Sequence, residues 1–188
     1  MLVKIYGSAI HGVSAQTITI EVNVATSGVG YHVVGLPDSA IKASRYRISA
    51  ALKKQGFKIP GKKVTVNMAP ADIRKEGTAY DLSIALGILT ASEQINAENI
   101  GDYIIMGELS LDGGLLPIKG VLPIAIKARE EGFKGIILPK QNIREAAIVD
   151  QLEVYGIENI KEVIDFFNHG IPLERTTIDT RKEFQEKI

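Results

Sequence analysis

The chain has 188 residues, a length that suits one domain with an ordinary hydrophobic core. It contains no cysteine and only three histidines, none at metal-ligand spacing, so we expect neither disulfides nor a metal site. No apolar run is long enough to cross a membrane, and the first residues do not resemble a signal peptide. We therefore expect a cytoplasmic protein with no membrane partner.

The formal net charge is zero, but the charges are unevenly spread along the chain. Residues 39–71 carry eight basic residues and no acidic one, whereas residues 72–188 carry thirteen basic and twenty acidic residues. A basic segment on an otherwise acidic domain indicates a surface for a charged partner.

In the first half, alternation of apolar and polar residues predicts strands, and apolar residues at helical spacing predict helices. These patterns place strands at 17–25, 31–34 and 63–68, a helix at 39–55 and a buried helix at 82–91. The last segment is apolar almost all round, which is typical of a helix enclosed by other elements. No element is predicted for residues 1–16.

In the second half, a hairpin is predicted around the turn Asp112-Gly113-Gly114. The hairpin strands are expected at 103–109 and 115–118, and they are followed by a helix at 121–131, a strand at 135–138, a helix at 142–149, a strand at 152–157 and a helix at 160–168. Hairpins followed by strand–helix alternation indicate the α+β class. Beyond residue 170 the sequence turns polar and loses its periodicity, so we predict a domain over residues 1–170 and a linker over residues 171–188.

Much of the basic segment falls on the helix predicted at 39–55. On a helical wheel two rows of basic residues lie away from the apolar stripe, and they are our candidates for nucleic-acid binding: Lys42, Arg45 and Lys53 in one row, Arg47 and Lys54 in the other. Such a surface can contact phosphates with salt-dependent affinity. The alternatives are a solvated face that balances the acidic remainder, or a surface that docks another domain.

Several motifs that carry chemistry are missing from the sequence. There is no G-x-x-x-x-G-K-[ST] phosphate-binding loop and no G-x-S-x-G nucleophile elbow. Three acidic residues lie close together, Asp72, Glu76 and Asp81, and we expect them in a solvated loop and helix start. Composition and periodicity alone therefore lead no further than an α+β domain.

Three blocks of sequence are long and distinctive: residues 34–38 (VGLPD), residues 64–77 (VTVNMAPADIRKEG) and residues 80–89 (YDLSIALGIL). They resemble the VGLPD, TVNLAPADLRKEG and FDLPIALGIL blocks of the ComM/YifB family of magnesium-chelatase-related AAA+ proteins. The resemblance spans about residues 1–168.

The second half is also similar to the proteolytic domain of Lon, at residues 107–120 (GELSLDGGLLPIKG) and 136–139 (IILP). This likeness implies the α+β fold of ribosomal protein S5 domain 2. In Lon a serine attacks the peptide carbonyl and a lysine takes its proton. Aligned on Lon's motifs, Ala79 stands at the serine and Ile124 at the lysine, so the resemblance implies that the dyad is lost.

The alternative is residual ATP-dependent serine protease activity through a shifted pair, Ser83 and Lys127, each about one helical turn farther along the chain. Attack on a peptide requires close placement of nucleophile and base. We expect instead that the Ser83 hydroxyl bonds to the preceding helical turn and that Lys127 is solvated.

The resemblance implies a non-catalytic N-terminal accessory domain, connected by the linker to an AAA+ motor that is absent from this chain. The family is associated with ATP-dependent branch migration of DNA in recombination and natural transformation, and older descriptions call its members ATP-dependent proteases or magnesium chelatases. ATP and magnesium belong to the motor, and no cofactor is expected in this domain. The expected partners are the motor domain and neighbouring subunits of a hexameric ring, with DNA contact as an open alternative.

Overall fold

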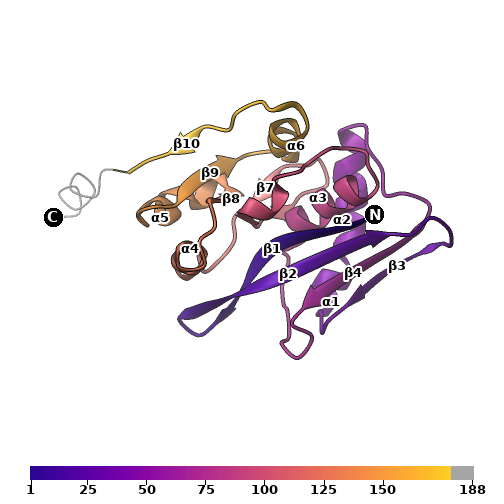
Figure 1. Ribbon diagram of the computed structural model, residues 1–188, viewed down its shortest axis with the longest axis horizontal. Helices are drawn as coiled ribbons and strands as arrows, with labels where there is room; N and C mark the ends of the chain where they lie inside the picture. Colours follow the sequence, from indigo (N-terminus) through magenta and orange to yellow (C-terminus); the bar gives the residue numbers. More distant parts are fainter. Residues whose placement is uncertain (179–188) are drawn as a thin grey trace.

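The computed structural model describes residues 1–178 and contains one mixed sheet of eight strands (Figure 1). The strands lie in the order β10-β9-β8-β5-β1-β2-β4-β3. Their bounds are β1 Leu2–His11, β2 Ser14–Val24, β3 Gly30–Val34, β4 Lys63–Ala69, β5 Tyr103–Ile105, β8 Gly135–Pro139, β9 Glu153–Ile157 and β10 Arg175–Thr176. A separate small hairpin consists of β6 Glu108–Leu109 and β7 Leu115–Leu116.

The helices are short to medium in length. Their bounds are α1 Ser39–Lys42, α2 Ser44–Lys54, α3 Asp81–Ala91, α4 Val121–Glu130, α5 Ile143–Ala147 and α6 Ile160–His169, with 3-10 turns η1 Ile100–Asp102 and η2 Lys140–Asn142. In the described part of the chain, no helix is long and apolar enough to cross a membrane.

Parallel pairing predominates in the sheet. β1–β5, β5–β8, β8–β9 and β3–β4 are parallel, whereas β1–β2, β2–β4 and β9–β10 are antiparallel. A first half built on the antiparallel strands β1, β2 and β4 and a second half built on the parallel strands β5, β8 and β9, each with helices of its own, are compatible with the predicted α+β class.

β1 is the element that the sequence analysis missed. Val3 and Ile5 on one face are buried and Leu2 and Lys4 on the other are exposed, but the small residues of positions 7–9 interrupt this alternation. The strand nevertheless pairs with β2 over all ten of its residues and lies in the middle of the sheet.

Three other predictions need adjustment. The helix expected at 39–55 is divided into α1 and α2 at Ala43, which keeps helical dihedral angles (φ −78°, ψ −9°). The expected hairpin is reduced to β6 and β7, because β5 joins the main sheet instead. Within the segment expected to be a linker, β10 pairs with β9; residues 179–188 of that segment lie outside the described residues.

α3 is buried along its whole length, as predicted from its apolar sequence. It packs against the face of β1 and β2 that carries Ile5 and Val22, where Gly87 allows close approach. α4 lies over the opposite face, since Ile10 of β1 contacts Gly120 at the start of α4. The end of the β1–β2 hairpin therefore lies near the loop before α3, which carries Ala79, and near α4, which carries Ile124.

Candidate functional site

A cavity of about 760 Å³ opens beside the end of β1. Its walls are the last residues of β1 (8–11), the loop that leads into α3 (74–80) and the segment before α4 (117–120). Ala79 and Ile124 both line this cavity, although they are far apart in the sequence. The structure therefore brings together the two positions that the Lon alignment marks as serine and lysine.

Two of the hydroxyl groups that line this cavity, those of Ser8 and Tyr80, are hydrogen-bonded to main-chain carbonyl oxygens. Ser8 Oγ donates to the Gln16 carbonyl oxygen at 3.2 Å, and Tyr80 Oη donates to the Ser8 carbonyl oxygen at 3.2 Å. Burial raises the pKa of Tyr80 well above its usual range. Among the described residues, no hydroxyl that lines the cavity is hydrogen-bonded to a lysine or histidine, the arrangement that activates a hydroxyl nucleophile.

The shifted pair, Ser83 and Lys127, is not brought together at the cavity. Ser83 is buried in α3 and its Oγ donates to the carbonyl oxygen of Ile105 in β5. The expectation that this hydroxyl bonds to the preceding turn was therefore wrong, because a neighbouring strand offers a carbonyl. Lys127 Nζ lies 3.8 Å from Glu131 on the partly exposed side of α4.

A buried lysine that the sequence analysis did not mark holds the cavity's loop in place. Lys75 is completely buried, and its Nζ donates to the carbonyl oxygens of Gly35 and Met68, at 2.8 Å each, and to that of Pro70. Burial lowers the pKa of this amine. The only sequence signal for Lys75 was its position within the RKEG block.

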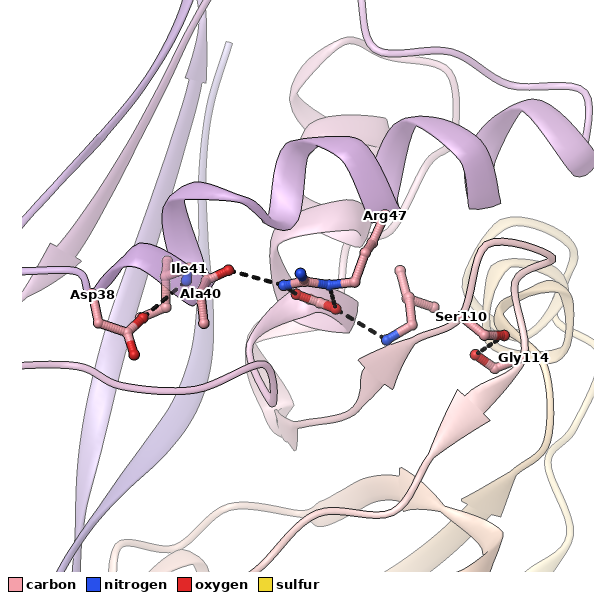
Figure 2. Close-up of polar contacts among 8 residues, drawn as sticks. Asp38, Ala40, Ile41, Arg47, Ser110 and Gly114 are labelled. Carbon is pink, nitrogen blue, oxygen red and sulfur yellow. Dashed lines mark hydrogen bonds and ion pairs between the residues drawn. The ribbon is translucent and has the colours of Figure 1, made fainter.

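Asp38, like Lys75, connects the first sequence block (VGLPD) to the second block, which ends in RKEG. Its Oδ1 accepts a hydrogen bond from Ile41 N at 2.9 Å and so caps α1, as Figure 2 shows. Its Oδ2 accepts from Gly77 N at 2.9 Å, in the cavity's loop. The VGLPD block is thus bonded to the RKEG block through both side chain and main chain.

Asp81 and Arg47 connect the third block to α2. Figure 2 shows Arg47 with its contacts as dashed lines. Arg47 Nε and Nη2 donate to the two carboxylate oxygens of Asp81 at 2.7 and 2.9 Å, and Nη2 also donates to the Ala40 carbonyl at 2.9 Å. Leu109 N donates to Asp81 Oδ2 at 3.1 Å. Burial raises the pKa of Asp81, and the hydrogen bonds from Arg47 oppose that rise.

Two sequence predictions are corrected by this ion pair. Asp81 begins α3 as expected, but it is 1% exposed and therefore not solvated. Arg47 was placed in a row away from the apolar stripe as a candidate for nucleic-acid binding, yet its side chain is only 22% exposed and bonds to Asp81. A helical wheel could not show this, because the carboxylate lies 34 residues away in the sequence.

The other four basic candidates are exposed. The guanidinium of Arg45 lies 5.6 Å from the ring centroid of Tyr31, and the charge of Lys54 contributes to a lowered pKa of Asp112, after the hydrogen bonds from Ser110 and Gly114. We call the three exposed residues of the first row, Lys42, Arg45 and Lys53, the basic surface. It occupies α1 and α2, away from the cavity's lining.

The first two sequence blocks are hydrogen-bonded to each other, and residues of the second and third blocks line one cavity. This arrangement of family-like blocks defines a class of domain. The chain belongs to the family described as subunit ChlI of Mg-chelatase, whose model matches residues 20–142. It is 40% identical to competence protein ComM of Haemophilus influenzae over 167 residues, which cover 89% of this chain and 33% of that protein. It is 37% identical to the uncharacterized protein YifB of Salmonella typhimurium over 93% of this chain and 34% of that protein.

The similarity to Lon is weaker but present. Lon protease 2 of Bacillus subtilis is 30% identical over 139 residues, which cover 73% of this chain and 24% of that protein. The predicted relation to ComM and YifB is confirmed. The chain spans about a third of the length of these ComM and YifB relatives.

Proposed function

We propose that this chain is a non-catalytic accessory domain of a ComM/YifB-type AAA+ ATPase, with the fold of ribosomal protein S5 domain 2. The observation that carries the proposal is the pairing of Ala79 and Ile124 in one cavity. A methyl group and an aliphatic chain occupy the two positions at which Lon-type chemistry requires a nucleophile and a base. ATP and magnesium are bound by the motor domain of the whole protein, and this domain takes no cofactor.

We further propose that the basic surface guides DNA for that motor in branch migration. Lys42, Arg45 and Lys53 are exposed, and Tyr46 beside them is 73% exposed. Exposed cations on neighbouring helices can contact the phosphate backbone of DNA, and each such contact releases a counterion. Removal of Arg47 from the candidate set leaves four exposed basic residues on α1 and α2, of which Lys54 belongs to the second row.

Ring assembly is the second candidate, and the charge distribution favours it. Lys140 is surrounded by carboxylates, of which Glu158 lies 3.0 Å from its Nζ and Glu162 and Glu174 act at longer range. An acidic surface and a basic surface on one domain can pair head to tail around a hexameric ring. Sedimentation at increasing protein concentration and two salt concentrations tests this assembly.

The DNA proposal is tested by fluorescence anisotropy with labelled single-stranded and forked DNA at low and physiological salt. The variant Lys42→Glu/Arg45→Glu/Lys53→Glu should bind more weakly, and its logarithmic salt slope should fall by roughly two units. The matched control, Lys4→Glu/Arg129→Glu/Lys161→Glu, changes the net charge equally at exposed residues elsewhere.

Equal binding by both variants, or no binding by the unmodified domain at low salt, would remove DNA contact and leave ring assembly. The non-catalytic role is tested separately with casein and a fluorophosphonate probe. Labelling at Ser83, or casein turnover lost in Ser83→Ala, would contradict it.

A further inference from the structure

The end of β1 has a free edge toward the cavity. β1 pairs with β2 along its whole length, but its register with β5 contains only Tyr6 and Ile104. Beyond this pair the chain after β5 turns away, and Gly107 N donates to the Ala79 carbonyl at 2.8 Å. Within residues 1–178, positions 8–11 of β1 therefore have no neighbouring strand on that side.

The main-chain groups of Ile10 are directed into this gap. Ser8 N donates to the sulfur of Met106 at 3.3 Å and Ser8 O accepts from Tyr80 Oη, so the main-chain groups of Ser8 point away from β2. Alternate residues of a strand direct their main-chain groups to the same side. The N–H and C=O of Ile10 therefore point away from β2 as well, and neither has a partner there among residues 1–178.

The cavity lies along this edge. Four consecutive residues of β1, at positions 8–11, line it, and consecutive residues of a strand share a cavity when it lies beside the strand. The opposite wall is held by Asn142, whose side-chain amide bonds to both Ile118 N and Ile118 O at 2.9 Å. Between the two walls, Ala79 and Ile124 supply an apolar floor.

We propose that this groove binds an extended peptide segment from a partner protein, which adds as a strand to the free edge of β1. One donor and one acceptor on Ile10 match the paired N–H and C=O of a peptide residue, and neither a phosphate backbone nor a lipid offers that pair. An aliphatic side chain of the segment lies over Ala79 and Ile124, with polar residues on either side toward Lys119 and Glu76. Strand addition with a side-chain pocket is an established mode of peptide recognition.

The test uses the ¹⁵N-labelled domain and a capped six-residue peptide with one central leucine flanked by threonines and lysines. Titration followed by NMR should give saturable shifts of the Ile10 and Lys119 amides. The same peptide with N-methyl groups on leucine and its two neighbours cannot donate to Ile10, so it should bind about tenfold more weakly or worse. Ala79→Phe, which fills the floor, should weaken binding of the unmodified peptide similarly, whereas Lys161→Glu, at an exposed residue outside the groove, should not.

The spectrum of Ala79→Phe shows directly whether that variant is folded, and the N-methylated peptide tests the proposal without any substitution. No shifts up to the solubility limit of the peptide, or equal binding of both peptides, would overturn the proposal. Mass spectrometry of the peptide after the titration separates the two proposals. Cleaved peptide would contradict the non-catalytic role while leaving the groove in place.

Discussion

At the residue scale, one buried ammonium group organises the loops around the cavity. Lys75 Nζ has three N–H donors and three main-chain carbonyl acceptors, so all three donors are used. Its own main chain bonds to Leu36 O and to Asp38 N, at 3.0 Å each. Lys75 therefore fixes the end of β4 against the loop after β3 and the loop before α3.

We expect Lys75→Met to lower the free energy of unfolding by about 3 kcal/mol, because three buried carbonyls lose their donor. Part of this loss is offset since an ammonium no longer has to be buried. Urea unfolding followed by circular dichroism measures the change. Lys4→Met, the same substitution at an exposed strand position, should change stability by less than about 0.5 kcal/mol. An unchanged free energy of unfolding in Lys75→Met would show that the three hydrogen bonds contribute nothing to stability.

Tyr31 leads to a prediction about alkaline pH. Burial raises the pKa of Tyr31 to about 12, whereas tyrosine in an unfolded chain ionises near pH ~10. The folded state therefore holds this proton more tightly. The resulting stability is fully present below the unfolded pKa and is lost as the pH rises through the folded pKa.

We expect the free energy of unfolding to fall between pH ~10 and ~12, and to fall less in Tyr31→Phe. At neutral pH this substitution should change stability by less than about 1 kcal/mol, because the contact of Tyr31 Oη with the Ser44 hydroxyl falls short of a well-formed hydrogen bond. Urea unfolding at several pH values measures both effects. The control is Tyr46→Phe, at a largely exposed tyrosine, and an identical pH dependence in both variants would argue against Tyr31 as the source.

At the element scale, α3 depends on close approach to the sheet rather than on helix propensity. Gly87 lies in the middle of the helix, where glycine is about 1 kcal/mol less favourable than alanine. A Cβ at this position would lie 2.6 Å from Val22 Cγ2 and 3.2 Å from Ile5 Cδ1. The glycine therefore sets the distance between α3 and the central strands.

Gly87→Ala should lower stability by about 1–3 kcal/mol, because overpacking against β2 exceeds the gain in helix propensity. The double variant Gly87→Ala/Val22→Ala should be more stable than the sum of the two single changes predicts, since the contact is relieved. Thermal unfolding of the four proteins completes this cycle. If Gly87→Ala alone raised the stability, β1 and β2 would have moved to accept the added methyl group without a cost in packing.

At the scale of the whole molecule, β1 joins two halves of different construction. On one side lie the antiparallel strands β2 and β4 with β3, and on the other the parallel strands β5, β8 and β9. α3 packs against the centre, and the buried apolar side chains form one continuous core. The two halves therefore share their central strand, and one hydrophobic core extends through both of them.

We expect the domain to unfold in one cooperative transition, with the slowest amide exchange in β1, β2 and α3. Hydrogen exchange followed by NMR measures this order. The small hairpin β6–β7 and the short strand β10 should exchange fastest among the paired strands, because each contributes only two residues to its pairing. Exchange of the β5–β8–β9 half at a lower free energy than the rest would contradict a shared core.

The sequence by itself determined the elements whose pattern is local. The buried helix α3, the alternating strand β4 and the apolar strand β8 each carry their own periodicity, so they were predicted close to their observed places. The blocks that placed the chain in its family are also continuous in sequence, and the comparisons confirm that relation.

Only the tertiary structure decided the features that depend on distant partners. β1 was missed because its small residues interrupt the alternation of apolar and polar residues, and its pairing with β2 is not visible in its own sequence. Arg47 points inward because it pairs with Asp81, which is buried beside it. The alignment named Ala79 and Ile124, but only the tertiary structure places the loop before α3 and the first turn of α4 beside the same cavity. Periodicity reports the burial of a residue along its own element, whereas the partner of a buried charge or of a strand edge is chosen by the whole fold.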